Sequence, residues 1–301
     1  MPNTRTILVT GSNGQLGQSL KSLATQHPQY QFTFIDCVEL DLSNSNSIAN
    51  YFKQNQFDLI INCAAYTAVD KAEQEQELAN VINHLAVKQL AEIAKQYDSI
   101  LIHISTDYVF DGTGYKPYLE NDQTNPQSVY GASKLKSEQA IQNIAPKAII
   151  IRTSWLYSEY GANFVKTMLR LGQDRESLNV IVDQVGTPTY AKDLATAILK
   201  IIDVCCTNQN FFVQEQQVQL YHYSNEGVCS WYDFAKTIFE YTNVPCTVSA
   251  IETKDYPTAA KRPHYSVLNK AKIKQTYNLS IPYWKDALQA CLNNYQETKI
   301  K

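Results

Sequence analysis

The first 155 residues alternate short apolar runs with longer stretches of helical periodicity. Five runs predict strands: TILVT at 6–10, QFTFID at 31–36, DLIINCA at 58–64, SILIHIS at 99–105 and KAIIIRT at 147–153. Parallel neighbours cannot be joined by a tight turn, so helices between the runs indicate right-handed crossovers. The alternation predicts an α/β fold with a Rossmann-type doubly wound parallel sheet.

The later part of the chain loses this rhythm and becomes richer in Tyr, Asn and Pro. Helical patterns remain near 230–242 and 283–295, and the polar stretch 207–219 is expected to be a surface loop. We therefore expect a smaller C-terminal lobe that covers the carboxyl edge of the sheet, where ligands of such folds bind.

The expected division of the chain follows from this change. Residues 1–155 should form the first domain, to which the chain returns around 190–225, and residues 156–301 should form mainly the smaller lobe.

Charge and cysteine content exclude several classes of protein. The chain has 26 basic and 29 acidic residues with its lysines scattered, so neither nucleic acid nor an anionic membrane surface is an expected partner. The polar start before the first apolar run leaves no room for a signal peptide, and no apolar stretch is long enough to cross a bilayer. Seven cysteines without a C-x-x-C pair suit reduced thiols, so we expect a cytoplasmic protein.

The first predicted strand leads directly into GSNGQLG, which contains Gly11, Gly14 and Gly17. Glycine suits a tight turn, lets the backbone approach a pyrophosphate, and allows close packing of helix on strand. The helix that follows would point its N-terminus at the anion. Because the motif lies between strand and helix, we interpret it as the phosphate cradle of an NAD(P)-binding domain rather than a structural turn.

Asp36 closes the second predicted strand, where an acidic side chain bonds the adenosine ribose in dinucleotide-binding folds. No Arg or Lys lies within the glycine loop, and Cys37 and Val38 follow the aspartate. The sequence thus offers no cation for a 2′-phosphate. We expect NADH or NADPH as the cofactor, with NADH favoured.

Three Tyr-x-x-x-Lys pairs occur in the chain: Tyr130 with Lys134, Tyr232 with Lys236, and Tyr295 with Lys299. A free phenol has a pKa of about 10, and an ammonium one helical turn away would lower that pKa toward neutrality. Only the first pair follows the fourth predicted strand, which places it over the cofactor crevice. We predict Tyr130 as the proton donor in carbonyl reduction, with Lys134 lowering its pKa and bonding the nicotinamide ribose.

The fourth predicted strand ends in STDYVFDGTG, so Thr106, Asp107 and Tyr108 should leave the carboxyl edge of the sheet. The Thr106 hydroxyl can bond and orient the substrate carbonyl oxygen. His103 is expected to be a buried strand residue. The five histidines have no ligand spacing and no G-x-S-x-G elbow is present, so neither a metal site nor an acyl-transfer hydrolase is expected.

Eight segments between residue 7 and about 290 resemble one known family when taken in order. They are GSNGQLG, INCAAYTAVDKAE, STDYVFDGTG, YGASK, RTSWLY, DQVGTPTYAKDLA, HYSNEGVCSWYDFA and YPTAAKRPHYSVLN. This series resembles the dTDP-4-dehydrorhamnose reductase family, which belongs to the extended short-chain dehydrogenase/reductases. The resemblance implies NAD(P)H-dependent reduction of the C4 keto group of dTDP-4-dehydro-L-rhamnose, a nucleotide-sugar substrate, to dTDP-L-rhamnose.

The resemblance also implies roles for individual residues. The catalytic residues would be Thr106, Tyr130 and Lys134. Cofactor contacts would come from Gly11, Gly14, Gln15, Leu16, Gly17, Asp36, Asp41, Leu42, Ala64, Ala65, Thr67, Tyr130 and Lys134. Substrate contacts would come from Val69, Thr106, Asp107, Tyr108, Trp155 and Arg262.

Two of these substrate contacts have structural alternatives. Trp155 would give the sugar an apolar wall, or it could belong to the core. Arg262 would grip the diphosphate, because a planar guanidinium matches that geometry, or it could form a salt bridge between the lobes. Asp70 and Lys71 are expected to hold a loop together by ion pairing.

Other functions on the same fold also stay open. One relative of the family is a catalytically silent regulatory subunit of methionine adenosyltransferase, but the retained Thr106, Tyr130 and Lys134 favour an enzyme. Nucleotide-sugar epimerases and dehydratases share the loop and the Tyr-Lys pair, but dehydratases usually place an acid pair after the Thr, and here Asp107 is followed by Tyr108.

The assembly state is left open between monomer and homodimer. Some members of the family dimerise through Mg²⁺ bound partly by an acidic side chain soon after the third glycine. Gln18 and Ser19 occupy that stretch here, so a bridging metal is not expected. The stereochemistry at C4 is also left open, because it depends on how the sugar is oriented in the site.

Overall fold

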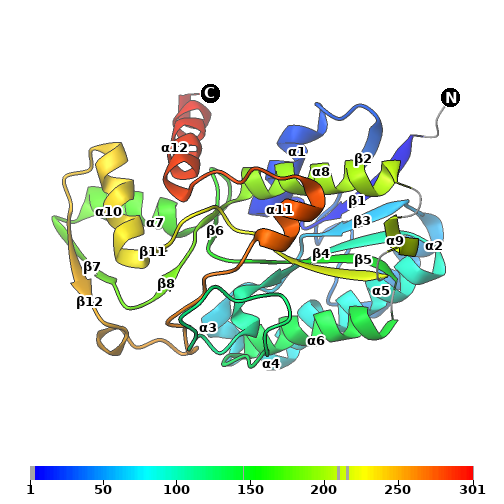
Figure 1. The fold of residues 1–301 in the computed structure, drawn as a ribbon, viewed down its shortest axis with the longest axis horizontal. Helices are drawn as coiled ribbons and strands as arrows, with labels where there is room; N and C mark the ends of the chain where they lie inside the picture. The colour runs from blue at the N-terminus through cyan, green and yellow to red at the C-terminus, as the bar shows by residue number, and fades with distance from the viewer. Residues whose placement is uncertain (1–3, 145, 209–210, 215–216, 301) are drawn as a thin grey trace.

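The centre of the molecule is a six-stranded parallel sheet in the order β10-β5-β4-β3-β1-β2 (Figure 1). The structure is a computed structural model and describes residues 4–144, 146–208, 211–214 and 217–300. The strands of this sheet are β1 (Arg5–Thr10), β2 (Tyr30–Phe34), β3 (Leu59–Asn62), β4 (Ile100–Thr106), β5 (Lys147–Thr153) and β10 (Val218–His222). The predicted doubly wound parallel sheet is confirmed.

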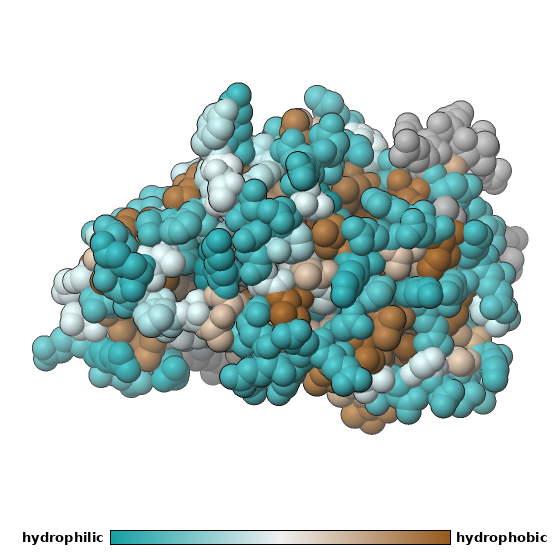
Figure 2. Space-filling view, turned by 90° about the horizontal axis from the view of Figure 1, so that it is seen from below, coloured by the Kyte–Doolittle hydropathy of each residue, from teal (hydrophilic) through white to brown (hydrophobic). Residues whose placement is uncertain are grey.

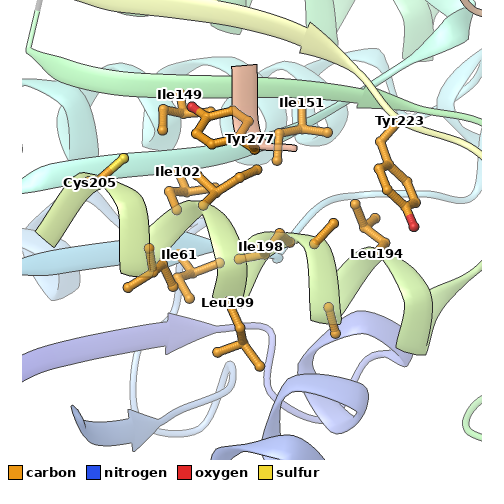
Figure 3. Packing of buried hydrophobic residues seen from close by; sticks show 14 of the residues in the cluster. Ile61, Ile102, Ile149, Ile151, Leu194, Ile198, Leu199, Cys205, Tyr223 and Tyr277 are labelled. Atoms are coloured by element: carbon orange, nitrogen blue, oxygen red, sulfur yellow. The ribbon is translucent and has the colours of Figure 1, made fainter. Parts of the chain in front are cut away.

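Helices cover both faces of the sheet, because β1 has apolar side chains on each face that must be buried. Its side chains alternate, so Ile7 and Val9 enter one apolar cluster and Leu8 enters the other. One face carries α1 (Gln15–Ala24), α8 (Ala191–Thr207) and α11 (Ala271–Tyr277), and the other carries α2 (Ser45–Gln54), α5 (Ala86–Gln96) and α6 (Val129–Ile144). Figure 3 shows the first face, where Ile61, Ile102 and Ile149 of the strands lie against Ile198 of α8.

The sheet has a topological switch beside β1. From β1 the chain crosses to β2 on one side, and β3 then pairs with β1 on the other side. The loops after β1 and β3 therefore part above the carboxyl ends of the strands and leave a crevice there. Short helical segments follow β3 and β4 along this edge: α3 (Val69–Ala72), α4 (Gln76–Asn80), the π-helical turn η1 (Val81–Leu85) and the 3₁₀ turn η2 (Asp107–Val109).

The second part of the molecule packs three helices around its own apolar cluster, at the left in Figure 1. These helices are α7 (Phe164–Asp174), α10 (Trp231–Thr242) and α12 (Trp284–Ile300). Ser230 begins α10 with a reciprocal capping box to Asp233, and Asn163 caps α7 through the amide of Lys166. Both predicted helices of this part, at 230–242 and 283–295, are present.

Short strand pairs join this part to the crevice. They are β6 (Leu156–Tyr157) with β9 (Thr189–Tyr190), β8 (Val185–Gly186) with β11 (Cys229–Ser230), and β7 (Ser177–Ile181) with β12 (Thr247–Ile251), and a 3₁₀ turn η3 (Thr253–Asp255) follows.

The expectation of a surface loop at 207–219 is wrong for the described part of that range. Phe211 and Phe212, in the short helix α9 (Phe211–Gln214), are each 6 % exposed and lie in the core cluster, and Val218 begins the sixth strand of the sheet. Residues 209–210 and 215–216 lie outside the described residues. The polar neighbours hid this segment because one buried aromatic pair gives no periodic signal. The proposed domain boundary at residue 155 stays a prediction, with α8 and β10 joining the sheet from beyond it.

Figure 2 views the molecule from below Figure 1, where hydrophilic residues predominate and hydrophobic residues form separate groups. Within the residues that the structure describes, no helix combines the length and apolarity needed to cross a membrane.

Candidate active site

A cavity of about 640 Å³ opens at the carboxyl edge of the sheet, above the switch point. The wall brings together the predicted residues Gly11, Gly14, Gln15, Leu16, Gly17, Asp36, Asp41, Leu42, Ala64, Ala65, Thr67, Val69, Thr106, Asp107, Tyr108, Tyr130, Lys134 and Trp155. Of the predicted set, Arg262 is the residue that is not part of the wall. The roles of these residues stay predictions.

The glycine loop has the shape that a phosphate cradle requires. Gly11 has φ +64°, and a Cβ there would lie 2.7 Å from the backbone nitrogen of Ala64. A Cβ on Gly17 would lie 2.4 Å from the carbonyl oxygen of Gly11. Gly14 is the N-cap of α1 and supplies no side chain to its free amides, so the positive end of the helix faces the cavity. These residues fit a dinucleotide pyrophosphate.

Asp36 lies in the wall of the cavity beside the glycine loop, and both of its carboxylate oxygens accept hydrogen bonds. Oδ2 accepts from the backbone amide of Asn13 and Oδ1 accepts from that of Cys37, each at 2.8 Å. Partial burial acts to raise the pKa of Asp36, but these hydrogen bonds outweigh it and hold the pKa below its ordinary value. Asp36 is therefore a fixed negative charge in the wall of the cavity.

Tyr130 and Lys134 both reach the cavity from the first turns of α6. The Lys134 side chain is 1 % exposed, and its Nζ donates to the carbonyl oxygen of Ile104 at 2.6 Å and lies 3.1 Å from His103 Nε2. Burial lowers the pKa of Lys134 to about 7, against the opposing charges of Glu138 and Cys63. The ammonium thus titrates near neutral pH.

The pKa of Tyr130 moves in the direction opposite to our prediction from the Tyr-Lys spacing. Burial raises it to about 12, while hydrogen bonding with Thr106 acts to lower it. Lys134 does not counter this effect, because its ammonium is turned to the carbonyl oxygen of Ile104. Tyr130 is therefore fully protonated at neutral pH.

The two other Tyr-x-x-x-Lys pairs lie away from this cavity. Tyr232 is on α10, where Lys236 Nζ stands 5.7 Å from the centre of its ring. The ring of Tyr295 receives Lys166 from α7, with Nζ 5.3 Å from its centre, and the side chain of Lys299 lies outside the described residues. Of the three pairs, Tyr130 with Lys134 is the one that the structure places in the wall of the cavity.

Thr106 and Asp107 form a buried pair at the end of β4. The Thr106 hydroxyl donates to Asp107 Oδ1 at 2.9 Å and accepts from the amide of Tyr108 at 3.2 Å. Asp107 Oδ2 is buried and has no hydrogen-bond partner. Burial raises the pKa of Asp107 to about 7, although hydrogen bonding, that of Thr106 first, acts to lower it. An unpartnered carboxyl oxygen in the wall can receive a hydroxyl group of a bound sugar.

Trp155 forms an aromatic wall on the side of the second lobe. Its backbone has φ +48°, which is strained for a bulky residue, and its ring stacks on Trp231 with centroids 3.6 Å apart. Gly186 lies under the ring, where a Cβ would be 2.8 Å from Trp155 Cε2. The close packing offsets this strain and holds the indole at the cavity.

Arg262 is placed between the two lobes. Its Nη2 donates to Asp70 Oδ2 at 2.6 Å, while Asp70 Oδ1 accepts from the amide of Ala260 at 3.0 Å. This is the salt bridge that we considered as the alternative to a diphosphate contact. Nη1 of Arg262 is buried without a hydrogen-bond partner, so the guanidinium keeps one unused donor group.

Some contacts in the site were not predicted from the sequence, among them those of Asn163 and Ser158 with Gln15. Gln15 Oε1 accepts from Asn163 Nδ2 at 2.9 Å and from Ser158 Oγ at 3.0 Å, which holds the segment after β6 against the glycine loop. His103 is a buried strand residue, as expected, but its contact with Lys134 was not foreseen. Across the described ranges, no group of three or more His, Cys, Asp or Glu side chains could hold a metal ion.

The fold and the site together define the class of protein. A doubly wound sheet with a glycine loop at its switch point, and a Tyr-Lys pair on the helix beside it, are the features of an extended short-chain dehydrogenase/reductase. Comparison with known proteins agrees. The family model of the RmlD substrate binding domain matches residues 5–297.

The chain belongs to the RmlD family, the dTDP-4-dehydrorhamnose reductases, and is an oxidoreductase. A dTDP-4-dehydrorhamnose reductase of Aggregatibacter actinomycetemcomitans is 43% identical over 293 residues, covering 94% of this chain and 97% of that protein. The crystal structure of the enzyme from Clostridium acetobutylicum superposes with a TM-score of 0.89 at 39% identity, covering 97% of this chain and 99% of its own. That of Bacillus anthracis, in complex with NADP, gives a TM-score of 0.89 at 38% identity with the same coverage.

Proposed function

We propose that this chain reduces the C4 keto group of dTDP-4-dehydro-L-rhamnose to give dTDP-L-rhamnose, with NADH or NADPH as the cofactor. The observation that carries the proposal is that Thr106, Tyr130 and Lys134 line one cavity with the glycine loop. The relatives that match over nearly the whole chain carry the name of this reaction, and one of them was solved with NADP.

The residues of the cavity divide the work of the reaction. NADH or NADPH, when bound, supplies a hydride to C4. Tyr130 donates its phenolic proton to the C4 oxygen, so the O–H bond of the phenol breaks as the O–H bond of the product forms. The raised pKa of Tyr130 ensures that this proton is present at neutral pH. The Lys134 ammonium is turned to Ile104 in this structure, so it must turn toward Tyr130 to stabilise the phenolate that remains. It would also bond the nicotinamide ribose.

Thr106 and Asp107 would orient the carbonyl and the sugar. The Thr106 hydroxyl has a single proton, which it donates to Asp107 Oδ1 in this structure. The hydroxyl must therefore turn to donate to the C4 oxygen when substrate binds. Asp107 has a pKa of about 7 and is therefore partly protonated at neutral pH. In its protonated, neutral form it can lose the hydrogen bond from Thr106 without being left as an unpaired buried charge.

The remaining assignments belong to the same proposal. Asp36 favours NADH, because a 2′-phosphate would meet its negative charge, and Lys134 is the single Lys or Arg in the described wall of the cavity. Arg262 would offer its unused Nη1 to the diphosphate. We propose a cytoplasmic protein, monomeric or homodimeric, that binds neither nucleic acid nor membrane.

The test is to follow NADH and NADPH oxidation at the nicotinamide absorbance with enzymatically generated dTDP-4-dehydrorhamnose. Wild type should oxidise both, with the higher kcat/KM for NADH. Tyr130→Phe should lower kcat by about 10²- to 10⁴-fold, the usual contribution of general acid catalysis. Tyr232→Phe, which alters the equally spaced pair on α10, should leave kcat unchanged.

Three results would contradict the proposal. Wild type that binds nucleotide and oxidises none with this substrate is not this reductase, and a regulatory subunit becomes the better reading. Product formation without net nucleotide consumption indicates an epimerase or dehydratase. Full activity in Tyr130→Phe removes Tyr130 as the acid.

A further inference from the structure

A chain of buried polar side chains runs from the cavity through Thr10, Asn62 and His103 to Lys134. The first three have no part in the proposed mechanism. Thr10 Oγ1 lies 2.7 Å from Asn62 Oδ1, and Asn62 Nδ2 lies 3.1 Å from His103 Nδ1. His103 Nε2 lies 3.1 Å from Lys134 Nζ. The four residues are at most 2 % exposed, and Thr10 also lines the cavity. Their hydrogen bonds therefore form inside the protein and depend on one another.

The partners of His103 determine which ring nitrogen carries the proton. Asn62 Oδ1 accepts from Thr10, so the Asn62 amide donates to His103 Nδ1 and the ring proton lies on Nε2. Ser137 Oγ, 3.1 Å from Nε2, can accept this proton, because its own proton goes to the Lys134 carbonyl at 2.6 Å. In this first arrangement Lys134 Nζ faces an N–H group, which suits a neutral amine and opposes an ammonium.

The same heavy-atom positions allow a second arrangement, because the oxygen and nitrogen of an amide exchange places when it flips. Asn62 Oδ1 then accepts from Nδ1–H of His103, and Asn62 Nδ2 donates to the Thr10 hydroxyl. Nε2 of His103 is left with a lone pair that accepts from the Lys134 ammonium. Burial, and then the charge of Lys134, hold the pKa of His103 well below its ordinary value, so the imidazole is neutral in both arrangements.

We propose that His103 is a positioning residue for Lys134, whose ammonium it binds through Nε2, and that the His103 tautomer follows the charge of Lys134. Because the ring carries one proton in both arrangements, it stores no charge of its own. The proposal rests on the proposed function in one respect, which is that the reduction needs a charged Lys134.

The other groups that face Lys134 do not supply this lone pair. Glu138, one turn further along α6, is committed to Arg152, with Arg152 Nη2 2.7 Å from its Oε2. Cys63, after β3, is protonated because burial raises the pKa of its thiol to about 12, and Tyr130 is protonated for the same reason. Ile104 offers a backbone carbonyl that no side-chain substitution removes. Substituting His103 therefore isolates its contribution.

The first experiment measures kcat against pH, with saturating NADH and dTDP-4-dehydrorhamnose, for wild type, His103→Phe and His222→Phe. His222 is the matched control, since it is also 0 % exposed and faces a cation, with its Nε2 3.3 Å from Arg152 Nη1. A hydrogen bond to a charged group is stronger than one to a neutral group by an amount equal to about one pKa unit. The alkaline fall of kcat should therefore begin about one pH unit lower in His103→Phe and stay in place in His222→Phe, with the nucleotide-sugar KM unchanged in both. Coincident profiles for wild type and His103→Phe, or equal shifts in both variants, overturn the proposal.

The second experiment needs no substrate and uses ¹⁵N-labelled histidine. The imidazole nitrogen shifts of wild type at pH 6, where Lys134 is charged, should show the His103 proton on Nδ1. Lys134→Met should move it to Nε2. The same tautomer in both proteins sinks the proposal even if His103→Phe does not fold. Wild type that is inert in the first experiment but shows the tautomer change contradicts the proposed function alone.

Discussion

Asp107 is buried in the wall of the cavity, so its ionisation should make the free energy of unfolding depend on pH. The residue is 3 % exposed, and burial raises its pKa to about 7. An acid whose folded pKa is above its unfolded value binds more protons in the folded protein. Its protonated form contributes stability that is fully present below about pH 4 and is lost as the pH rises to about 7.

We therefore predict that Asp107→Asn gains stability relative to wild type as the pH rises. The amide keeps the shape of the carboxyl and cannot ionise. Between pH 5 and pH 8 the free-energy difference should grow by up to about 3 kcal/mol, measured by denaturant unfolding at each pH.

Asp111→Asn is the matched control for this prediction. The pKa of Asp111 is lowered, first by the hydrogen bond from the amide of Thr113, so it is ionised in both folded and unfolded states above pH 5. Its effect on stability should be constant over the same pH range. Parallel pH curves for wild type and Asp107→Asn would show that Asp107 is ionised throughout.

At the scale of the element, the turn from β1 into α1 is held by backbone contacts that leave no room for a side chain. The second and third glycines of the loop differ in this respect. A Cβ on Gly17 would lie 2.4 Å from the carbonyl oxygen of Gly11 and 2.6 Å from Ser12 Cα, whereas a Cβ on Gly14 would lie 3.2 Å from that carbonyl oxygen.

Gly17→Ala should therefore destabilise the protein more than Gly14→Ala does. We expect a loss of about 1–3 kcal/mol for Gly17→Ala, since the helix or the loop must shift. Gly14 is an N-cap with extended backbone, and Ala there should cost less than about 1 kcal/mol. Thermal unfolding of both variants without cofactor measures the difference, and equal losses would mean that α1 moves freely against the loop.

The elements that could be predicted from the sequence are those whose pattern is repeated. The strands β1, β3, β4 and β5 are largely buried on both faces, so their apolar runs are continuous and bounded by turns. The edge strand β10 reads VQLYH and has no such run, because Gln219 and His222 enter it. The motif residues Thr106 and Tyr130 were predictable because their distance from strand ends places them on the sheet edge. The direction of the Lys134 side chain was not predictable, because it depends on the Ile104 carbonyl and the His103 imidazole, which both belong to β4.

At the scale of the whole molecule, the cavity is closed by contacts between segments far apart in the chain. Gln15 binds Asn163 across 148 positions, and Arg262 binds Asp70 across 192. The second contact joins the loop region after β3 to the C-terminal part beside the cavity. Sequence spacing contains no information about which acid such an arginine meets, so the sequence left both interpretations of Arg262 open.

The two interpretations of Arg262 predict different behaviour in two variants. Arg262→Lys keeps a cation but loses the planar fork, and Asp70→Asn removes the ion pair but leaves the guanidinium in place. If Nη1 grips the diphosphate, Arg262→Lys should raise the KM for the nucleotide sugar about tenfold with little change in kcat, while Asp70→Asn should leave this KM unchanged or lower.

Stability measurements complete this comparison. The side chains of Arg262 and Asp70 are 21 % and 46 % exposed, so solvent screens the pair and its loss should cost at most about 1 kcal/mol of unfolding free energy. If the salt bridge only joins the lobes, Asp70→Asn, which removes the pair, should raise KM and lower stability at least as much as Arg262→Lys, which can keep it. An equal rise of KM in Asp70→Asn and Arg262→Lys would mean that substrate binding depends on the ion pair rather than on the guanidinium. Arg262 would then have no place in the substrate site, and the diphosphate would be left to the backbone amides around the cavity.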